Sequence, residues 1–334
     1  MPTTTNPPPT LRILSLDAGV QSTFLLKVAT TGTWARMWNM SIDAAIFADT
    51  GWEPPEVYEH LDRIEQMWAR PAGIPIYRVS SGHIRNDILE GRSHGSIPLF
   101  VRNPDGSDGH LRRGCTDRYK LQGIRRKVRQ LLGYPGTRRI PAGVRAEMLI
   151  GFSEDEITRV RPSMVRYMTS RFPLIEHGYD RDDCEWDLRT FYPHPVPRSA
   201  CVGCPFHTNA HWRVMKTHHP DQWADAVAFD AAIRNGAPGP ARAGQPLRGT
   251  AYLHRSRLPL DQAPIEHVTR REARAARLRA QWTASVAPGR TPLSYATADP
   301  ATTHTDHTSD APAEHTCSPW GCRSDSEPAD EART

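Results

Sequence analysis

The chain of 334 residues lacks the features of a membrane-spanning or exported protein. No apolar run reaches the roughly 18 residues that a transmembrane helix needs. The first ten residues are rich in proline and threonine, and no basic segment followed by an apolar one begins the chain, which is unlike a signal peptide. We therefore expect a soluble, cytoplasmic protein without a membrane partner.

Cysteine, net charge and internal repetition are also low. Six cysteines in a cytoplasmic chain argue against a disulfide framework, and the formal charge of +5 permits an anionic partner without demanding one. No repeat is visible, which argues against a solenoid. What the chain does have is 38% apolar residues, enough to bury the core of one large domain.

Apolar runs alternate with helical patterns over the first part of the chain. Residues 11–16, 44–48 and 74–79 are short apolar runs, and the segments after the first two have helical spacing. This order predicts an α/β fold, a parallel sheet with helices on both faces, and loops gathered at the carboxyl edge of the sheet. Further strands are expected at 97–101 and 146–152, and helices at 116–132, 209–234 and 265–285.

The turn after the first strand has the composition of a phosphate-binding loop. It contains Asp17, Ala18, Gly19 and Val20 and leads directly into a helix. Small residues let the backbone approach an anion, and the first turn of a helix presents unpaired N–H groups. Many strand–helix turns look similar, so the turn by itself indicates a site only weakly.

Cys201 and Cys204 form a Cys-x-x-Cys pair, the strongest local signal in the chain. This spacing lets two sulfurs face one metal ion, and Cys115 could supply a third thiolate. Zinc with His207 or Cys184 as fourth ligand, a redox pair, and two structural thiols remain as alternatives.

Basic residues are concentrated between Arg112 and Arg145, where acids are few. Such a run fits either a solvated helix face or a wall that binds nucleotide phosphates or an RNA or DNA backbone. The sequence does not separate the two.

Six segments together resemble one family. The first, Ser15–Thr23, is similar to the PP-loop of the adenine nucleotide alpha-hydrolase superfamily, in its phosphoadenosine phosphosulfate reductase-like branch. The other five, in the order found in that branch, are Phe47–Glu53, Arg113–Lys120, Gly151–Arg159, Pro173–Glu176 and Ser199–His207. The segments span about residues 11–260.

The resemblance implies an ATP-like nucleotide bound with Mg²⁺ at the carboxyl edge of the sheet. It places Ser15, Ala18, Gly19, Val20, Gln21, Ser22 and Thr23 at the phosphates and Asp49 and Thr50 near the adenosine. It makes Cys115, Asp155 and Arg159 the catalytic candidates. It also implies that Cys115, Cys201 and Cys204 hold a [4Fe-4S] cluster, with Zn²⁺ as the alternative.

The implied organisation is a nucleotide-binding domain over 11–180 and a cysteine-containing helical region over 181–285. The ends, 1–10 and 286–334, are expected to be disordered. The implied activity is cleavage of ATP between its α- and β-phosphates, adenylation of an acceptor and sulfur transfer from a donor that the sequence does not identify. RNA or DNA is one candidate acceptor.

Two departures keep other functions open. Asp17 stands where this branch has glycine, so it either helps to hold Mg²⁺ or weakens the nucleotide site. The weaker site would suit a non-catalytic nucleotide-binding partner in a nucleic-acid modification or defence system. A sulfonucleotide reductase needs a C-terminal catalytic cysteine in a Glu-Cys-Gly-x-His context, which Cys317 and Cys322 lack.

Overall fold

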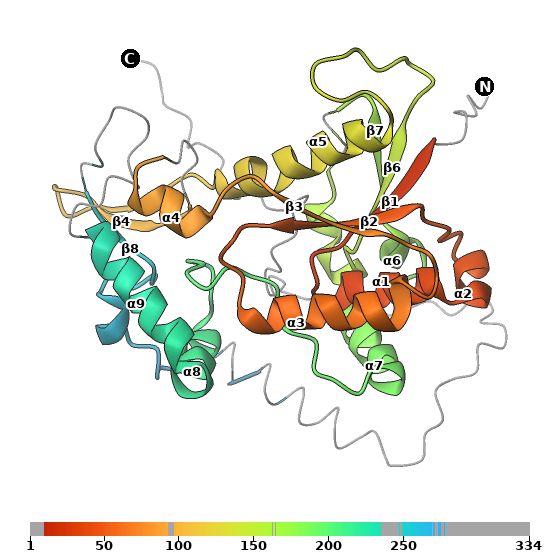
Figure 1. Ribbon diagram of the computed structural model, residues 1–334. Helices are drawn as coiled ribbons and strands as arrows, with labels where there is room; N and C mark the ends of the chain where they lie inside the picture. Colours follow the sequence, from red (N-terminus) through yellow and green to blue (C-terminus); the bar gives the residue numbers. More distant parts are fainter. Residues whose placement is uncertain are drawn as a thin grey trace, which may run out of the picture.

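The computed structural model describes residues 10–92, 97–161, 163, 165–234, 247, 249–268, 270, 273, 274 and 277. Its central element is a five-stranded parallel sheet in the order β3-β2-β1-β6-β7 (Figure 1). The strands are β1 (Leu11–Ser15), β2 (Ala44–Asp49), β3 (Ile76–Ser80), β6 (Ala146–Ile150) and β7 (Met168–Arg171). The central strand β1 therefore bonds to a parallel neighbour on each side.

Helices cover both faces of this sheet, as predicted (Figure 1). The helices around it are α1 (Val20–Thr30), α2 (Gly32–Met37), α3 (Pro55–Ile64), α5 (Gln122–Leu131), α6 (Pro173–Glu176) and α7 (Arg181–Phe191). Leu14 and Phe47 pack into a cluster with α1, α3 and α7. Their neighbours Ile13 and Ile46 point to the other face and pack with α5. This parallel sheet with covered faces confirms the α/β fold class. The strands were readable in the sequence because strands buried on both faces form continuous apolar runs.

A second apolar cluster lies beside the sheet. It joins α4 (Ile84–Leu89), α8 (Asn209–His218) and α9 (Pro220–Arg234) to a small antiparallel sheet. That sheet has the order β5-β4-β8 and contains β4 (Phe100–Arg102), β5 (Asp108–His110) and β8 (Thr250–Tyr252). Trp52, from the loop after β2, packs on Phe229 of α9 with 4.6 Å between ring centroids. The Cys-x-x-Cys segment belongs to this cluster.

A buried carboxylate ties this second cluster together. Asp230 of α9 accepts hydrogen bonds from the backbone N–H groups of Leu253 at 2.8 Å and Leu260 at 2.9 Å, and it forms an ion pair with Arg234. Leu260 begins the short 3₁₀ helix η4 (Leu260–Gln262). Asp230 is paired and hydrogen-bonded, as a buried charge must be. Its two hydrogen bonds fix the segments at Leu253 and Leu260 to α9.

Several elements differ from the expectation. The strand predicted at 97–101 is β4, and it pairs antiparallel in the small sheet, outside the parallel one. The helix predicted at 209–234 is two helices, α8 and α9, because Pro220 cannot continue the first. The helix predicted at 116–132 begins with a wider π-helical turn, η2 (Thr116–Leu121), and α3 similarly ends in η1 (Glu65–Ala69).

Most of the expected loop at 236–249, most of the expected helix at 265–285, residues 1–9 of the expected disordered N-terminal end and the whole expected disordered C-terminal end lie outside the described residues. In the part of the chain that the structure describes, no helix is both long enough and apolar enough to cross a membrane.

Candidate functional site

The predicted phosphate loop lies at the carboxyl end of the central strand. β1 ends at Ser15, and α1 begins at Val20 after Gly19. Ala18 between them has a φ of 60°, in the left-handed region that residues other than glycine rarely adopt. The strand order reverses between β1 and β6, and ligands of open α/β sheets bind at such a point. The loop thus places the start of a helix where a ligand is expected.

The Asp17 carboxylate is bound to groups that an external anion would use. Its Oδ1 accepts the backbone N–H of Gly19 at 3.2 Å, and it also accepts a short hydrogen bond from the hydroxyl of Ser22. Both donors belong to the start of α1, where the helix dipole favours negative charge. The chain therefore supplies an anion of its own to this helix end.

The end of β6 closes the other side of the loop. Gly151 passes so close to α1 that a Cβ on it would lie 3.0 Å from the backbone nitrogen of Ser22. Beyond it, Gln21 Nε2 donates to Ser153 Oγ at 3.3 Å and to Glu156 Oε2 at 3.2 Å. Glycine at 151 thus permits the close approach of the two loops.

The segment after β6 exposes one of its neighbouring acids, the catalytic candidate Asp155, and buries the next. Asp155 is exposed, whereas Glu156 is buried, bonds Gln21 and forms an ion pair with Arg159. The guanidinium of Arg159 lies 4.7 Å from the centre of the Phe152 ring. Glu156, which is not among the catalytic candidates, is therefore the acid of the 3₁₀ helix η3 (Glu154–Arg159) that contacts the loop at residues 15–23.

The end of β2 carries the residues predicted near the adenosine. Asp49 accepts the N–H of Gly51 at 2.7 Å and the hydroxyl of Tyr58 at 2.8 Å. Burial, followed by this hydrogen bond, raises the pKa of Tyr58 well above its usual value. Thr50 is buried, and its hydroxyl lies 3.1 Å from Glu53 Oε1 and 3.1 Å from the Cys201 sulfur. Thr50 thus joins the phosphate-loop side to the cysteine motif.

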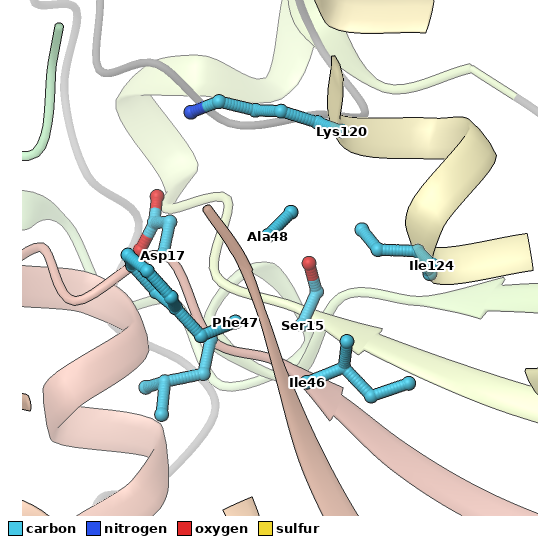
Figure 2. Close-up of a pocket in the computed structure, with 8 residues that line it drawn as sticks. Ser15, Asp17, Ile46, Phe47, Ala48, Lys120 and Ile124 are labelled. Carbon is cyan, nitrogen blue, oxygen red and sulfur yellow. The ribbon is translucent and has the colours of Figure 1, made fainter. Parts of the chain in front are cut away.

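A small pocket opens at the carboxyl ends of β1 and β2 (Figure 2). It is lined by Ser15, Leu16, Asp17, Ile46, Phe47, Ala48, Lys120 and Ile124. In this view the Lys120 ammonium and the Asp17 carboxylate lie on the same side of the pocket. Lys120 is 4% exposed, and its Nζ lies 3.8 Å from Glu53 Oε1. The enclosed space is about 10 Å³, roughly one water molecule.

The three predicted metal ligands share the second apolar cluster. Cys201 is buried in it, and Cys115 and Cys204 pack against it. Cys201 and Cys204 lie on one turn, closed by a 3.0 Å hydrogen bond from the Cys204 N–H to the Cys201 carbonyl. Even so, among the residues described, no group of three or more His, Cys, Asp or Glu side chains is arranged to hold a metal ion. The arrangement of the three sulfurs therefore gives no support of its own to a [4Fe-4S] cluster or a zinc ion, and both stay predictions from the sequence.

The alternative fourth ligands face elsewhere. Cys184 is buried in the other apolar cluster, and burial raises the pKa of its thiol. His207 Nε2 lies 2.9 Å from the carbonyl oxygen of Cys201 and 3.2 Å from that of Val202. Burial lowers the pKa of His207 well below its usual value. His207 therefore holds the backbone of the Cys-x-x-Cys turn.

The basic run is partly paired and partly exposed. Arg125 pairs with Asp117 at 3.0 Å, and the Lys127 ammonium lies 3.8 Å from the centre of the Tyr77 ring. Arg126 and Arg139 are exposed. Lys120, within the same run, is buried at the pocket and so differs from a solvated helix face. A nucleic-acid contact by the exposed part stays a prediction.

Thr23, the last residue of the phosphate loop, is bonded to a buried histidine. Its hydroxyl lies 2.9 Å from His60 Nε2, and His60 Nδ1 lies 2.8 Å from the hydroxyl of Tyr192. Burial, followed by the charges of Arg63 and His194, lowers the pKa of His60 from 6.5 to about 4. The neutral imidazole thus joins α1, α3 and the end of α7.

This histidine makes stability depend on pH. The unfolded chain takes up a proton on His60 below about pH 6.5, while the folded chain does so only near pH 4. Stability that is complete above pH 6.5 is therefore lost as the pH falls toward 4, and the His60 contribution is about 3 kcal/mol. Urea unfolding between pH 6.5 and pH 4 should show that the free energy of unfolding falls less steeply with pH in His60→Gln than in the parent.

The exposed His218 provides the control, since His218→Gln should keep the parent slope. Burial also lowers the pKa values of His211 and His254, so His60→Gln reduces the slope without abolishing it. An identical slope in the parent and in His60→Gln would contradict the assignment.

Two comparisons with known proteins give no neighbour. No protein-family model matches the chain, and no curated protein matches it. The family assignment therefore stays a prediction carried by the six motifs and their order.

Proposed function

We propose that the chain binds an adenine nucleotide, ATP being the ligand that best suits its motifs, at the carboxyl edge of the parallel sheet. The observation that carries this proposal is the start of α1 at the end of the central strand, where the strand order reverses. Backbone N–H groups at a helix start bind phosphate, and the nearby Lys120 ammonium supplies the opposite charge. Because the enclosed pocket is small, the nucleotide lies along the edge above it.

Lys120 tests the proposal directly. Its ammonium is the buried cation of the pocket, so a phosphate bound there gains a charge-assisted hydrogen bond. Lys120→Met should weaken ATP binding by about tenfold or more, as measured by calorimetry. Lys127→Met is the matched control. It removes a cation of α5 that lies over the Tyr77 ring of β3, and it should bind ATP as the parent does. Absence of any heat of association in the parent, with or without Mg²⁺, would refute the proposal.

Asp17 should oppose the nucleotide. Its carboxylate bonds the Gly19 N–H and the Ser22 hydroxyl, which are donors that a phosphate would need. In the absence of Mg²⁺, Asp17→Asn should therefore bind ATP roughly tenfold more tightly than the parent, because a like charge is removed. If Asp17→Asn instead binds more weakly when Mg²⁺ is present, Asp17 is a magnesium ligand.

We further propose the activity that the family resemblance implies. An oxygen atom of the acceptor forms a bond to the α-phosphorus of ATP, and pyrophosphate leaves. A sulfide-level sulfur nucleophile, supplied by a separate donor, then bonds to the acceptor and displaces AMP together with that oxygen. In such chemistry the protein mainly positions the reactants and neutralises charge. Nucleic acid is the acceptor class that the exposed arginines of the basic run favour.

A non-catalytic nucleotide-binding role is the second candidate, and the bonding of Asp17 to the phosphate donors favours it. Pyrophosphate release separates the two roles. An enzyme releases pyrophosphate when an acceptor is present, whereas a binding partner takes up ATP without turnover even as Asp17→Gly. A sulfonucleotide reductase would need a C-terminal cysteine, and Cys317 and Cys322 lie outside the described residues.

A metal ion or cluster held by Cys115, Cys201 and Cys204 is a separate proposal from the sequence, and binding would require the three thiols to come together. Protein purified without oxygen should contain iron and sulfide, or zinc, and Cys201→Ala should lose them. Cys184→Ala, a change in the other apolar cluster, should keep the parent content. A parent protein free of all three would remove the metal from the account.

A further inference from the structure

Glu53 lies between the pocket and the cysteine motif, and its side chain is 1% exposed. Its Oε1 accepts the Thr50 hydroxyl at 3.1 Å, lies 3.7 Å from the Cys201 sulfur and lies 3.8 Å from Lys120 Nζ. The Thr50 hydroxyl also lies 3.1 Å from the same sulfur. These four side chains, here called the Glu53 cluster, are buried together.

The backbone holds the two halves of this cluster against each other. The N–H of Val202 donates to the carbonyl of Trp52 at 2.9 Å. Gly203 lies so close to the Trp52 ring that a Cβ on it would come within 2.1 Å of a ring carbon. The Cys-x-x-Cys turn is therefore packed directly on the loop that carries Thr50 and Glu53.

Lys120 makes the cluster part of the pocket, because it both lines the pocket and pairs with Glu53. A phosphate that binds the ammonium competes with this carboxylate. Removal of a counter-charge from a buried carboxylate is strongly unfavourable. The Glu53 side chain therefore moves when Lys120 leaves it, and the position of every group bonded to Glu53 changes. The thiol of Cys201 is one of those groups.

We infer that Glu53 is a positioning residue that couples ligand binding at Lys120 to the exposure of the Cys201 thiol. This inference rests on the proposed nucleotide site. An anionic ligand draws Lys120 away from Glu53, the Glu53 cluster loosens, and the buried thiol becomes accessible. Without a ligand, Glu53 and Thr50 keep Cys201 covered.

Thiol alkylation of the full-length protein tests the ligand-free half. Iodoacetamide labelling is followed at each cysteine by tandem mass spectrometry, which separates Cys201 from Cys204 on their shared peptide. Glu53→Gln and Thr50→Val should each speed the labelling of Cys201 about fivefold, the factor expected for one lost hydrogen bond. Cys184, buried in the other cluster, reports global unfolding and should be labelled at the parent rate.

Glu65→Gln is the matched control. It removes the carboxylate of η1 that forms a 2.8 Å ion pair with Arg78 of β3, and it should leave Cys201 labelling unchanged. A Cys201 rate in Glu53→Gln and Thr50→Val equal to that of the parent overturns the inference. So does a rise confined to samples in which Cys184 is labelled equally fast.

The ligand half uses ATP and, separately, inorganic pyrophosphate, with binding confirmed by calorimetry on the same samples. Either ligand, when bound, should raise the Cys201 rate about fivefold in the parent and leave it unchanged in Glu53→Gln. Binding without a rise, or with a fall, overturns the coupling while the nucleotide site stands. Absence of binding overturns the proposed function, and the ligand-free comparison still decides whether Glu53 covers Cys201.

Discussion

The position of β1 between two parallel neighbours is the constraint on which the rest of the structure depends. Parallel pairing on both sides requires each crossover to pass over a face of the sheet, so both faces are covered and every strand ends at the same edge. The loops after β1, β2 and β6 meet there. Groups from Asp17, Thr50 and Ser153 are thus brought to one edge although they are far apart in the sequence.

Charge decides what this edge can bind. Lys120 is the cation that faces the pocket, while Asp17 and Glu53 are carboxylates beside it, one at the helix start and one paired with the lysine. In a buried setting each charge matters more than it would in water. A phosphate bound as proposed would therefore compete with two carboxylates of the chain for the helix start and for the lysine. Selectivity for one ligand over another depends on how readily each of these contacts is exchanged.

Much of the fold is readable from the sequence because the short apolar runs alternate regularly with helical patterns. The strands β1, β2, β3 and β6 and the two-faced covering of the sheet follow from them. β7 was not predicted, because Met168–Arg171 is short and carries three polar residues. α7 lies in the region 181–285 that is expected to be helical, but its bounds were not predicted, although Asp180 and Asp183 form a capping box that is visible as a spacing of acids.

The site divides in the same way. The strand-to-helix turn at residues 15–23 is predictable from composition and position, whereas only the family resemblance singles out the end of β2. Glu53, Lys120 and Glu156 belong to quoted motifs, yet their importance comes from burial and from partners across the fold, such as Gln21 for Glu156. No local pattern reports such partners. The same holds for the metal prediction, because ligand spacing in the sequence does not fix how three sulfurs are arranged in space.

The pairing of β4 with β8 has a consequence for biosynthesis. Val101 is opposite Ala251, so the edge of β4 stays unpaired while a ribosome adds about 150 further residues. The five-stranded sheet, whose last strand ends at Arg171, is complete well before β8 is made. A nascent chain thus passes through a stage with a folded centre and a bare strand edge, which is the state in which a chaperone would protect it from aggregation.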